Sequence, residues 1–121
     1  MRKIIIIALA IFLFACSRDG KYKIKDVEFR ENNFSEIEQN KTKVIFLNKS
    51  IIINKVNDGI EVISLLGDEK LLFTKNSDGI YECSDSEVTM QLITQGNYYD
   101  INLFGSRDNK YLNITIKLEK L

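Results

Sequence analysis

Thiols and carboxylates are the groups of this sequence with the greatest potential for chemistry. The chain has two cysteines, Cys16 and Cys83, and 17 acidic residues, but no histidine, the commonest general base and metal ligand. A serine or cysteine nucleophile needs a neighbouring base, so Ser–His and Cys–His arrangements are excluded. Paired carboxylates remain as a catalytic option, but the acidic residues follow turns and outward strand positions. We therefore expect a protein that is not an enzyme.

Oxygen ligands for a metal ion concentrate at one place in the sequence. Glu82, Asp85 and Glu87 lie within six residues and carry the oxygen atoms that a hard cation such as Ca²⁺ prefers. Their spacing lacks the EF-hand pattern and its glycine. Zinc, which relies on histidine and cysteine, has no ligand set here. We interpret this segment as a solvated turn between strands and predict no metal site.

The surroundings of Cys16 give it a different chemistry. Arg2 and Lys3 are followed by Ile4–Ala15, twelve residues without a charged or polar side chain. As a helix this run would rise about 18 Å, well short of the roughly 30 Å hydrocarbon core of a bilayer. A charged start, a short apolar run and a small residue are typical of a secretory signal. The sequence becomes polar immediately afterwards, at residues 17–21.

The junction Leu13-Phe14-Ala15-Cys16 resembles the lipobox of bacterial lipoproteins, in which a leucine and a small residue precede a cysteine that receives diacylglycerol. Leu13, Ala15 and Cys16 match this pattern, whereas Phe14 stands where a small residue is usual. The alternative is an ordinary signal peptide with the cysteine merely near its cleavage site. The resemblance covers the beginning of the chain and implies nothing about the domain that follows, which matches no specific family.

The lipobox resemblance, together with the length of the remaining sequence, predicts an organisation for the whole chain. We expect residues 1–15 to be a signal peptide, residues 16–21 a lipidated tether, and residues 22–121 a single domain. Cys16 would carry a diacylglycerol and an N-acyl chain, with palmitate as a fatty acid, and we expect no other cofactor. Several acyl chains hold a protein on a membrane durably, which places this one in the cell envelope. Ser17 resembles the residue that permits transfer to the outer membrane in cells with two membranes; otherwise we expect the outer face of the cell membrane.

The composition of the mature chain narrows its partners. Without residues 1–15 the chain has 106 residues, 15 basic and 17 acidic, and its net charge is 15 − 17 = −2. Nucleic acid binding needs a clustered basic surplus, so we expect no nucleic acid partner. Cys83 is left without a cysteine to pair with inside the chain. It fits a small buried hydrophobe, or alternatively an intermolecular disulfide.

Apolar and polar residues alternate throughout the mature chain, which is typical of antiparallel strands with one face in water. The alternation is clearest in the last third, where it predicts strands over Glu87–Thr94, Tyr98–Phe104 and Lys110–Leu118. Runs rich in Ile, Val and Phe predict five more strands, over Val44–Leu47, Ser50–Val56, Gly59–Leu65, Leu71–Lys75 and Ile80–Ser84. Two Asp-Gly pairs separate such runs and favour hairpins.

Two features near the start of the domain depart from simple alternation. Tyr22 and Ile24 are out of phase with Val27 and Phe29, as a β-bulge between them would produce. Residues 34–39 are ambiguous and could form one short helical turn capped by Asn33 or Ser35.

Eight or nine short strands joined by hairpin-length connections predict an all-β fold, a small antiparallel up-and-down meander. Such a meander closes into a barrel or half-open barrel of about eight strands, or folds into a two-layer β-sandwich. We prefer the barrel because closure leaves fewer exposed edges. Lipocalin-like and lysozyme-inhibitor-like lipoproteins are similar in architecture only.

Three aromatic residues give the only candidate contact surface. Tyr98, Phe104 and Tyr111 fall on outward positions of their strands, where they could form a contact patch or a second packing layer. We therefore expect a non-catalytic binding module with an envelope protein or glycan as its partner, and inhibitor- or immunity-type activity is one version of it. A structural or assembly accessory and a carrier of an apolar ligand are the alternatives.

Overall fold

The computed structural model describes residues 18–121 with the exception of residues 86 and 97. The predicted signal peptide, Cys16 and Ser17 lie outside the described residues. In the part of the chain that is described, no helix has both the length and the apolar character needed to cross a bilayer.

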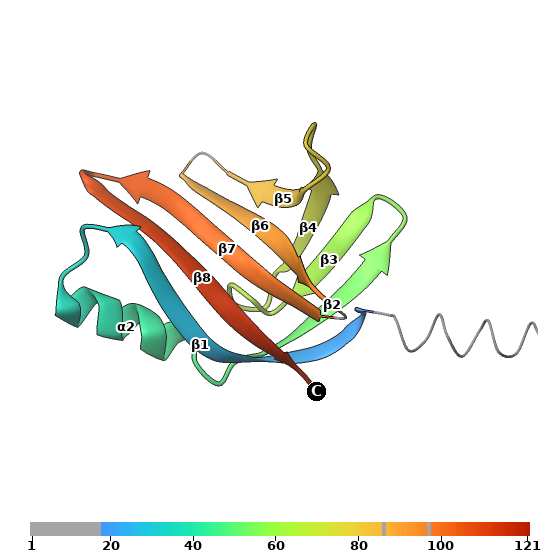
Figure 1. Ribbon diagram of the computed structural model, residues 1–121, viewed down its shortest axis with the longest axis horizontal. Coiled ribbons are helices and arrows are strands. Elements are labelled where there is room, and N and C mark those ends of the chain that lie inside the picture. Colours follow the sequence, from blue (N-terminus) through green and yellow to red (C-terminus); the bar gives the residue numbers. More distant parts are fainter. Residues whose placement is uncertain (1–17, 86, 97) are drawn as a thin grey trace, which may run out of the picture.

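The described residues form an eight-stranded antiparallel barrel with the strands in chain order (Figure 1). Each strand pairs with its neighbours in sequence, and β1 also pairs with β8, which closes the sheet. The predicted all-β meander is therefore confirmed in its closed-barrel form, and the chain does not form the sandwich. The strands are β1 (Gly20–Asn32), β2 (Ser50–Val56), β3 (Gly59–Ile63), β4 (Lys70–Lys75), β5 (Tyr81–Ser84), β6 (Val88–Gln95), β7 (Tyr98–Arg107) and β8 (Lys110–Lys120).

The bulge expected in β1 is present. Tyr22, Ile24 and Val27 are all buried in the core. The inward-facing positions therefore change from even to odd residue numbers between Ile24 and Val27. The pairing of β1 with β8 shifts register between Ile24 and Asp26, which makes Lys25 the extra residue. A bulge bends and twists its strand, and β1 uses this bend to pair with β2 at its start and with β8 along its length.

The prediction of a strand over Val44–Leu47 is wrong, because most of this segment is the last turn of a helix, α2 (Glu36–Phe46). Ser35, one of the two predicted caps, is the N-cap of this helix. The helix is much longer than the single turn expected. Its exposed apolar residues lie seven and eight positions apart, so Ile37, Val44 and Ile45 share one face. From the sequence alone, the apolar residues at the end of this helix cannot be distinguished from a short buried strand.

Side chains fill the barrel interior. Tyr22 and Phe73 are the largest fully buried residues, and isoleucine, leucine and valine side chains from β1, β2, β3, β7 and β8 pack around them. Eight strands enclose a space that side chains can fill. This filled core argues against the carrier alternative, which needs a lumen too wide for its own side chains.

The described end of the tether is fastened to the barrel. Arg18 donates a hydrogen bond from Nε to the Gly96 carbonyl at 3.0 Å, and its guanidinium lies 5.8 Å from the ring centre of Tyr99. The Arg18 carbonyl accepts a hydrogen bond from the Tyr22 hydroxyl at 2.6 Å. Burial raises the pKa of Tyr22 to about 12, so this hydroxyl keeps its proton. The chain is therefore held in place from Arg18 onward.

Candidate functional site

The three aromatic residues predicted as a contact patch fall into two groups. Phe104 pairs with Asn113 across β7 and β8, and Ser106 pairs with Tyr111, so Phe104 and Tyr111 are diagonal neighbours on the outer face. Their exposed fractions are 37% and 49%. Tyr98 lies six residues before Phe104 on the same strand, about 20 Å away, and is half-buried. The structure thus brings Phe104 and Tyr111 together and leaves Tyr98 apart.

An apolar cavity of about 280 Å³ opens at the same end of the barrel as Phe104 and Tyr111. Its wall consists of core-facing side chains at the end of the packed core. They are Val88 of β6, Leu103 of β7 and Leu112 of β8. Phe34, from the loop between β1 and α2, lines its side. We call this cavity the cup.

Gly105 allows two strands to approach closely at the edge of the cup. A Cβ atom at this position would lie 2.3 Å from the carbonyl oxygen of Glu87, far inside van der Waals contact. The same oxygen accepts a hydrogen bond from the Ser106 amide at 3.2 Å. A residue with a side chain at position 105 would therefore force β7 and the start of β6 apart.

Charged side chains form the rim of the cup. Arg107 lies 3.7 Å from the Glu87 carboxylate and 3.8 Å from that of Asp108, and Lys110 lies 2.9 Å from Glu38. Exposed ion pairs such as those of Arg107 contribute little to stability, and their charges make the rim polar. An apolar floor inside a polar rim is the usual composition of a protein-binding surface.

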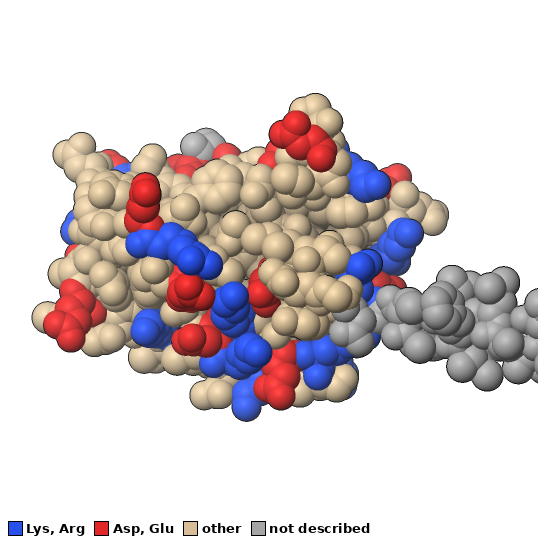
Figure 2. All heavy atoms as spheres, viewed as in Figure 1, with Lys and Arg blue, Asp and Glu red and all other residues tan. Residues whose placement is uncertain are grey.

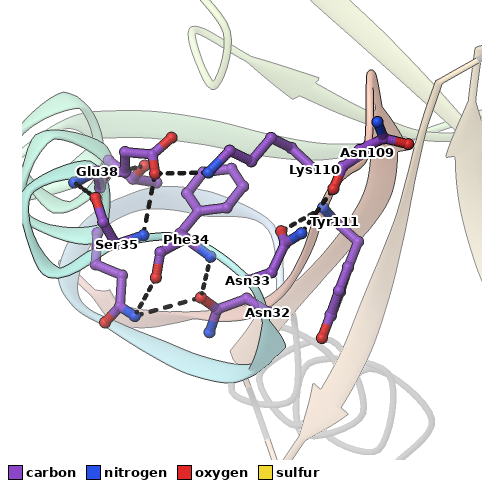
Figure 3. A network of polar contacts seen from close by, with 10 residues as sticks. Asn32, Asn33, Phe34, Ser35, Glu38, Asn109, Lys110 and Tyr111 are labelled. Carbon is purple, nitrogen blue, oxygen red and sulfur yellow. Dashed lines mark hydrogen bonds and ion pairs between the residues drawn. The ribbon is translucent and has the colours of Figure 1, made fainter.

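Asn33 ties the loop before α2 to the β7–β8 turn (Figure 3). Its side chain donates to the Asn109 carbonyl at 2.6 Å and accepts from the Tyr111 amide at 2.8 Å. Its backbone amide donates to the Tyr111 carbonyl at 3.3 Å. One residue thus fixes the loop that carries Phe34 to the strand that carries Tyr111.

Two further side chains fix the backbone of Phe34. The Asn32 side-chain oxygen accepts from the Phe34 amide at 2.9 Å. Gln39, on the first turns of α2, donates from Nε2 to the Phe34 carbonyl at 3.1 Å and to the Asn32 oxygen at 3.3 Å. Because both backbone groups of Phe34 are bonded, its backbone has a defined position beside the cup.

A capping box links α2 to the rim. The Ser35 hydroxyl accepts from the Glu38 amide at 3.2 Å, and the Glu38 carboxylate accepts from the Ser35 amide at 3.0 Å, the reciprocal pair that satisfies two free donors of a helix start. The same carboxylate oxygen bonds the Lys110 ammonium at 2.9 Å. The bond from Lys110, and then those to Ser35, lower the pKa of Glu38 from 4.5 to about 2.

The cup lies at the end of the barrel farthest from the tether. β1 begins at Gly20, within the last residues of the predicted tether, and its thirteen residues would extend about 40 Å as a straight strand. Its last residue, Asn32, pairs with Leu112 of the cup wall. In Figure 1 the start of β1 and the β7–β8 turn accordingly lie on opposite sides of the molecule.

The acidic segment considered for calcium is a hydrogen-bonded turn. The Asp85 carboxylate accepts from the backbone amides of Glu87 and Val88, both at 2.8 Å, and these bonds lower its pKa. Glu82 accepts a hydrogen bond from Gln91 at 3.2 Å. Among the residues that the structure describes, no three acidic or sulfur ligands come together.

Cys83 is half-buried on β5, where it packs against the edge of the core. Burial and then the nearby Asp85 carboxylate raise the pKa of its thiol. A protonated thiol is a poor nucleophile, which favours the packing role predicted for it.

Sequence reasoning missed Phe34 as a wall of the cup, and it gave Asn33 only a possible capping role. The contact of Asn33 with Tyr111 joins residues 78 positions apart, and it exists only because β1 closes onto β8. The one local signal was the pair of asparagines before the Ser35 cap, since asparagine favours turns and side-chain bonds to the backbone.

Comparisons with family models, with curated proteins and with solved structures give no match for this chain.

Proposed function

We propose that this chain is a lipoprotein of the bacterial cell envelope and that its barrel is a non-catalytic binding module. The lipoprotein part of this proposal is supported by the junction Leu13-Phe14-Ala15-Cys16. The observation that carries the binding module is the apolar cup, with its charged rim, at the end of the barrel opposite the predicted tether. Rigid concave apolar sites with a few polar groups are the usual form of binding sites, and they occur in the mouths of β-barrels.

Lipidation of Cys16 would orient this module on the membrane. Cys16 is two residues from Arg18, where the chain becomes fastened to the barrel, and two residues span at most about 7 Å. The tether end of the barrel would then lie against the bilayer, with the cup at the opposite end of the barrel and farther from the membrane. An anchored protein in this orientation presents the cup to other molecules of the envelope.

The size and surroundings of the cup favour a polypeptide partner. Its volume of about 280 Å³ is at the lower limit of small-molecule sites and suits one apolar side chain. Phe104 and Tyr111 provide exposed aromatic surface nearby, which is favoured at protein interfaces. Such a module acts as an inhibitor or immunity factor when it covers the active site of its partner, and as an assembly accessory when the partner is another envelope component.

A single substitution tests the anchor. We expect Cys16→Ser to abolish metabolic labelling with palmitate and to leave a larger, unprocessed precursor. Membrane fractionation of the wild type then tests the location, which we propose to be the outer membrane in cells with two membranes and the outer face of the cell membrane in others. Unchanged palmitate labelling of the variant would refute the lipoprotein assignment.

A cup-filling variant tests the binding site. A photo-crosslinking residue placed at Tyr111 in the full-length protein should give a discrete protein adduct in cells that make it. Val88→Phe adds a ring inside the cup and should abolish this adduct, while the melting temperature stays at or above that of the wild type. An unchanged adduct with Val88→Phe would show that the cup does not bind the partner.

Two further positions serve as controls. Phe34→Ala removes the side wall of the cup and should weaken the adduct without filling the cavity. Leu72 is an exposed apolar residue of β4, away from the cup, so a crosslinker there should give no adduct that Val88→Phe removes.

A further inference from the structure

A polar hollow of about 650 Å³ lies on the outer face of β1, β6, β7 and β8. A second hollow of about 500 Å³ continues it toward the tether end and shares Gln95, Asp100 and Lys117 with it. Together they form one elongated depression, which we call the polar groove. Its length runs along β7 and β8, and each of the two hollows has a volume in the range of ligand sites, about 300–1,000 Å³.

A chain of side-chain hydrogen bonds fixes the floor of the polar groove. The Thr115 hydroxyl is buried, donates to the Asn102 side-chain oxygen at 2.8 Å and accepts from Arg30 Nε at 3.3 Å. Arg30 is in turn paired with Glu28 at 3.1 Å. Three strands therefore hold this polar row in one arrangement before any ligand arrives.

Asp100 is a buried acid on the outer face. Its side chain is 4% exposed, one oxygen accepts from the Leu118 amide at 3.0 Å, and the other lies 3.6 Å from the Lys117 ammonium. A buried carboxylate is costly unless it is paired, and here the partners hold it rigidly at the junction of the two hollows.

The charges of the polar groove balance in both of its parts. Arg30 and Lys117 face Glu31 and Asp100 in the first hollow, and two basic and two acidic residues likewise line the second. Figure 2 shows blue and red side chains intermingled over β1 and β8, with no field of one sign. A polyanion or a polycation would therefore gain no net attraction along the groove.

Two amide side chains of the groove are available to a ligand. Asn113 is half-buried on β8 and Gln95 lies at the end of β6, and neither side chain has a hydrogen-bond partner among the described residues. Each amide offers two donors and an acceptor oxygen. Tyr98 lines the second hollow and adds a ring with an apolar face and a polar tip.

We propose that the polar groove binds a neutral saccharide chain. A sugar hydroxyl both donates and accepts hydrogen bonds, which matches the mixed set of amide, hydroxyl, carboxylate and guanidinium groups along the groove. The apolar face of a sugar ring can stack on Tyr98, and Ile93 provides a small apolar contact for a substituent. The elongated shape suits several linked rings.

The pairing of the strands distinguishes this ligand from a peptide. An extended peptide binds a sheet by adding to a free edge, but β6, β7, β8 and β1 are hydrogen-bonded to one another beneath the groove. A ligand in the groove can therefore bind side chains but cannot add to the sheet as a further strand.

Calorimetric titration of the full-length protein tests this proposal. The protein is held in a detergent without a sugar headgroup and titrated with chitotetraose, cellotetraose and maltotetraose, all neutral, and with anionic tetragalacturonate. We expect saturable binding of at least one neutral tetrasaccharide. Asn113→Ala should weaken that binding about fivefold or more, the effect of losing one hydrogen bond.

A matched substitution separates the groove from general effects. Asn54 is a half-buried strand asparagine of β2 that does not line the groove, and Asn54→Ala should leave binding unchanged. Tyr98→Phe should retain most of the affinity and Tyr98→Ala should lose it, because the ring and not the hydroxyl stacks. No binding of any neutral tetrasaccharide at about 10 mM, where a site with a Kd of 1 mM would be mostly filled, would overturn the proposal. Binding that Asn54→Ala and Asn113→Ala change equally, or binding of tetragalacturonate alone, would overturn it too.

Discussion

The carboxylate of Glu38 joins two elements that are far apart in the sequence. It closes the capping box of α2 with Ser35, and it bonds Lys110 of β8, 72 positions away. Asn33 makes a second connection of this kind, to the β7–β8 turn. At the scale of residues, the position of Phe34 beside the cup is therefore set by polar contacts on both sides of it.

The charge of Glu38 predicts a pH dependence. The pKa of Glu38 is lowered to about 2 in the folded protein from an ordinary value of 4.5, so its ionised form stabilises the fold. This contribution is complete above pH 4.5 and is lost as the pH falls through about 2. Glu38→Gln keeps the capping box, since glutamine also serves at this position, but it removes the charge.

Melting temperatures of wild type and Glu38→Gln, measured from pH 6 to pH 2, check this expectation. The wild type should be the more stable at pH 6, and the two curves should converge toward pH 2. A constant difference across this range would show that the carboxylate charge is not what stabilises the junction.

α2 is the element with the weakest attachment to the barrel. Phe46 is its one buried residue, and Ile37, Val44 and Ile45 are exposed. Its stability must therefore come largely from its own ends, from the capping box at the start and from acidic residues in the first turn and Lys43 in the last, which complement the helix dipole.

Removal of the cap should loosen α2 without opening the barrel. Ser35→Ala loses the N-cap bond, which typically costs about 1 kcal/mol, so hydrogen exchange of the α2 amides should become about fivefold faster. Ser35→Asp, which can also cap, should exchange like the wild type. Amides of β7 and β8 should not change in either variant, and their acceleration would mean that α2 and the barrel unfold as one unit.

The difference between β-strands and α2 explains what the sequence could predict. Strands such as β7 and β8 repeat polar and apolar residues with a period of two over many positions, and their predicted bounds differ from the observed ones by three residues or fewer. The end of α2 offered only a short apolar run, which local propensity assigns to a strand. The Ser35 cap was visible in the sequence, but the length of the helix was not.

The cup and the polar groove could not be predicted because they depend on closure of the barrel. Leu112 meets Asn32, and Thr115 meets Arg30, only after β8 pairs with β1. Alternation correctly placed Phe104 and Tyr111 on one outward face. It did not take account of the separation along β7, which puts Tyr98 about 20 Å from Phe104. Periodicity gives the face of each residue and says little about which residues of distant strands become neighbours.

At the scale of the whole molecule, the barrel has a continuous core in the described residues, from Tyr22 on β1 to Leu118 on β8. We expect residues 17–121 to fold without the proposed lipid anchor and to give a β-type circular dichroism spectrum with less than about a fifth helix, against roughly a third in globular proteins. A helix-dominated spectrum would contradict this.

The single thiol of the described residues gives a second whole-molecule prediction. Cys83 has no cysteine partner within residues 17–121, so a reducing agent should leave the melting temperature unchanged. A lower melting temperature in reductant, together with a dimer on non-reducing gels, would show that Cys83 forms a disulfide between two chains.

The course of β1 has a mechanical consequence. β1 runs from the tether to the cup, and its hydrogen bonds with β8 are perpendicular to the strands, so a pull between residue 18 and the β7–β8 turn loads all of them at once, in shear. The two ends of the described residues instead lie side by side, with the Leu121 amide bonded to the Lys21 carbonyl at 2.9 Å. Pulling these ends apart breaks the β1–β8 pairs one after another. Single-molecule force spectroscopy should therefore find a much higher rupture force between residue 18 and the turn, which is the direction in which a membrane anchor and a partner at the cup would pull.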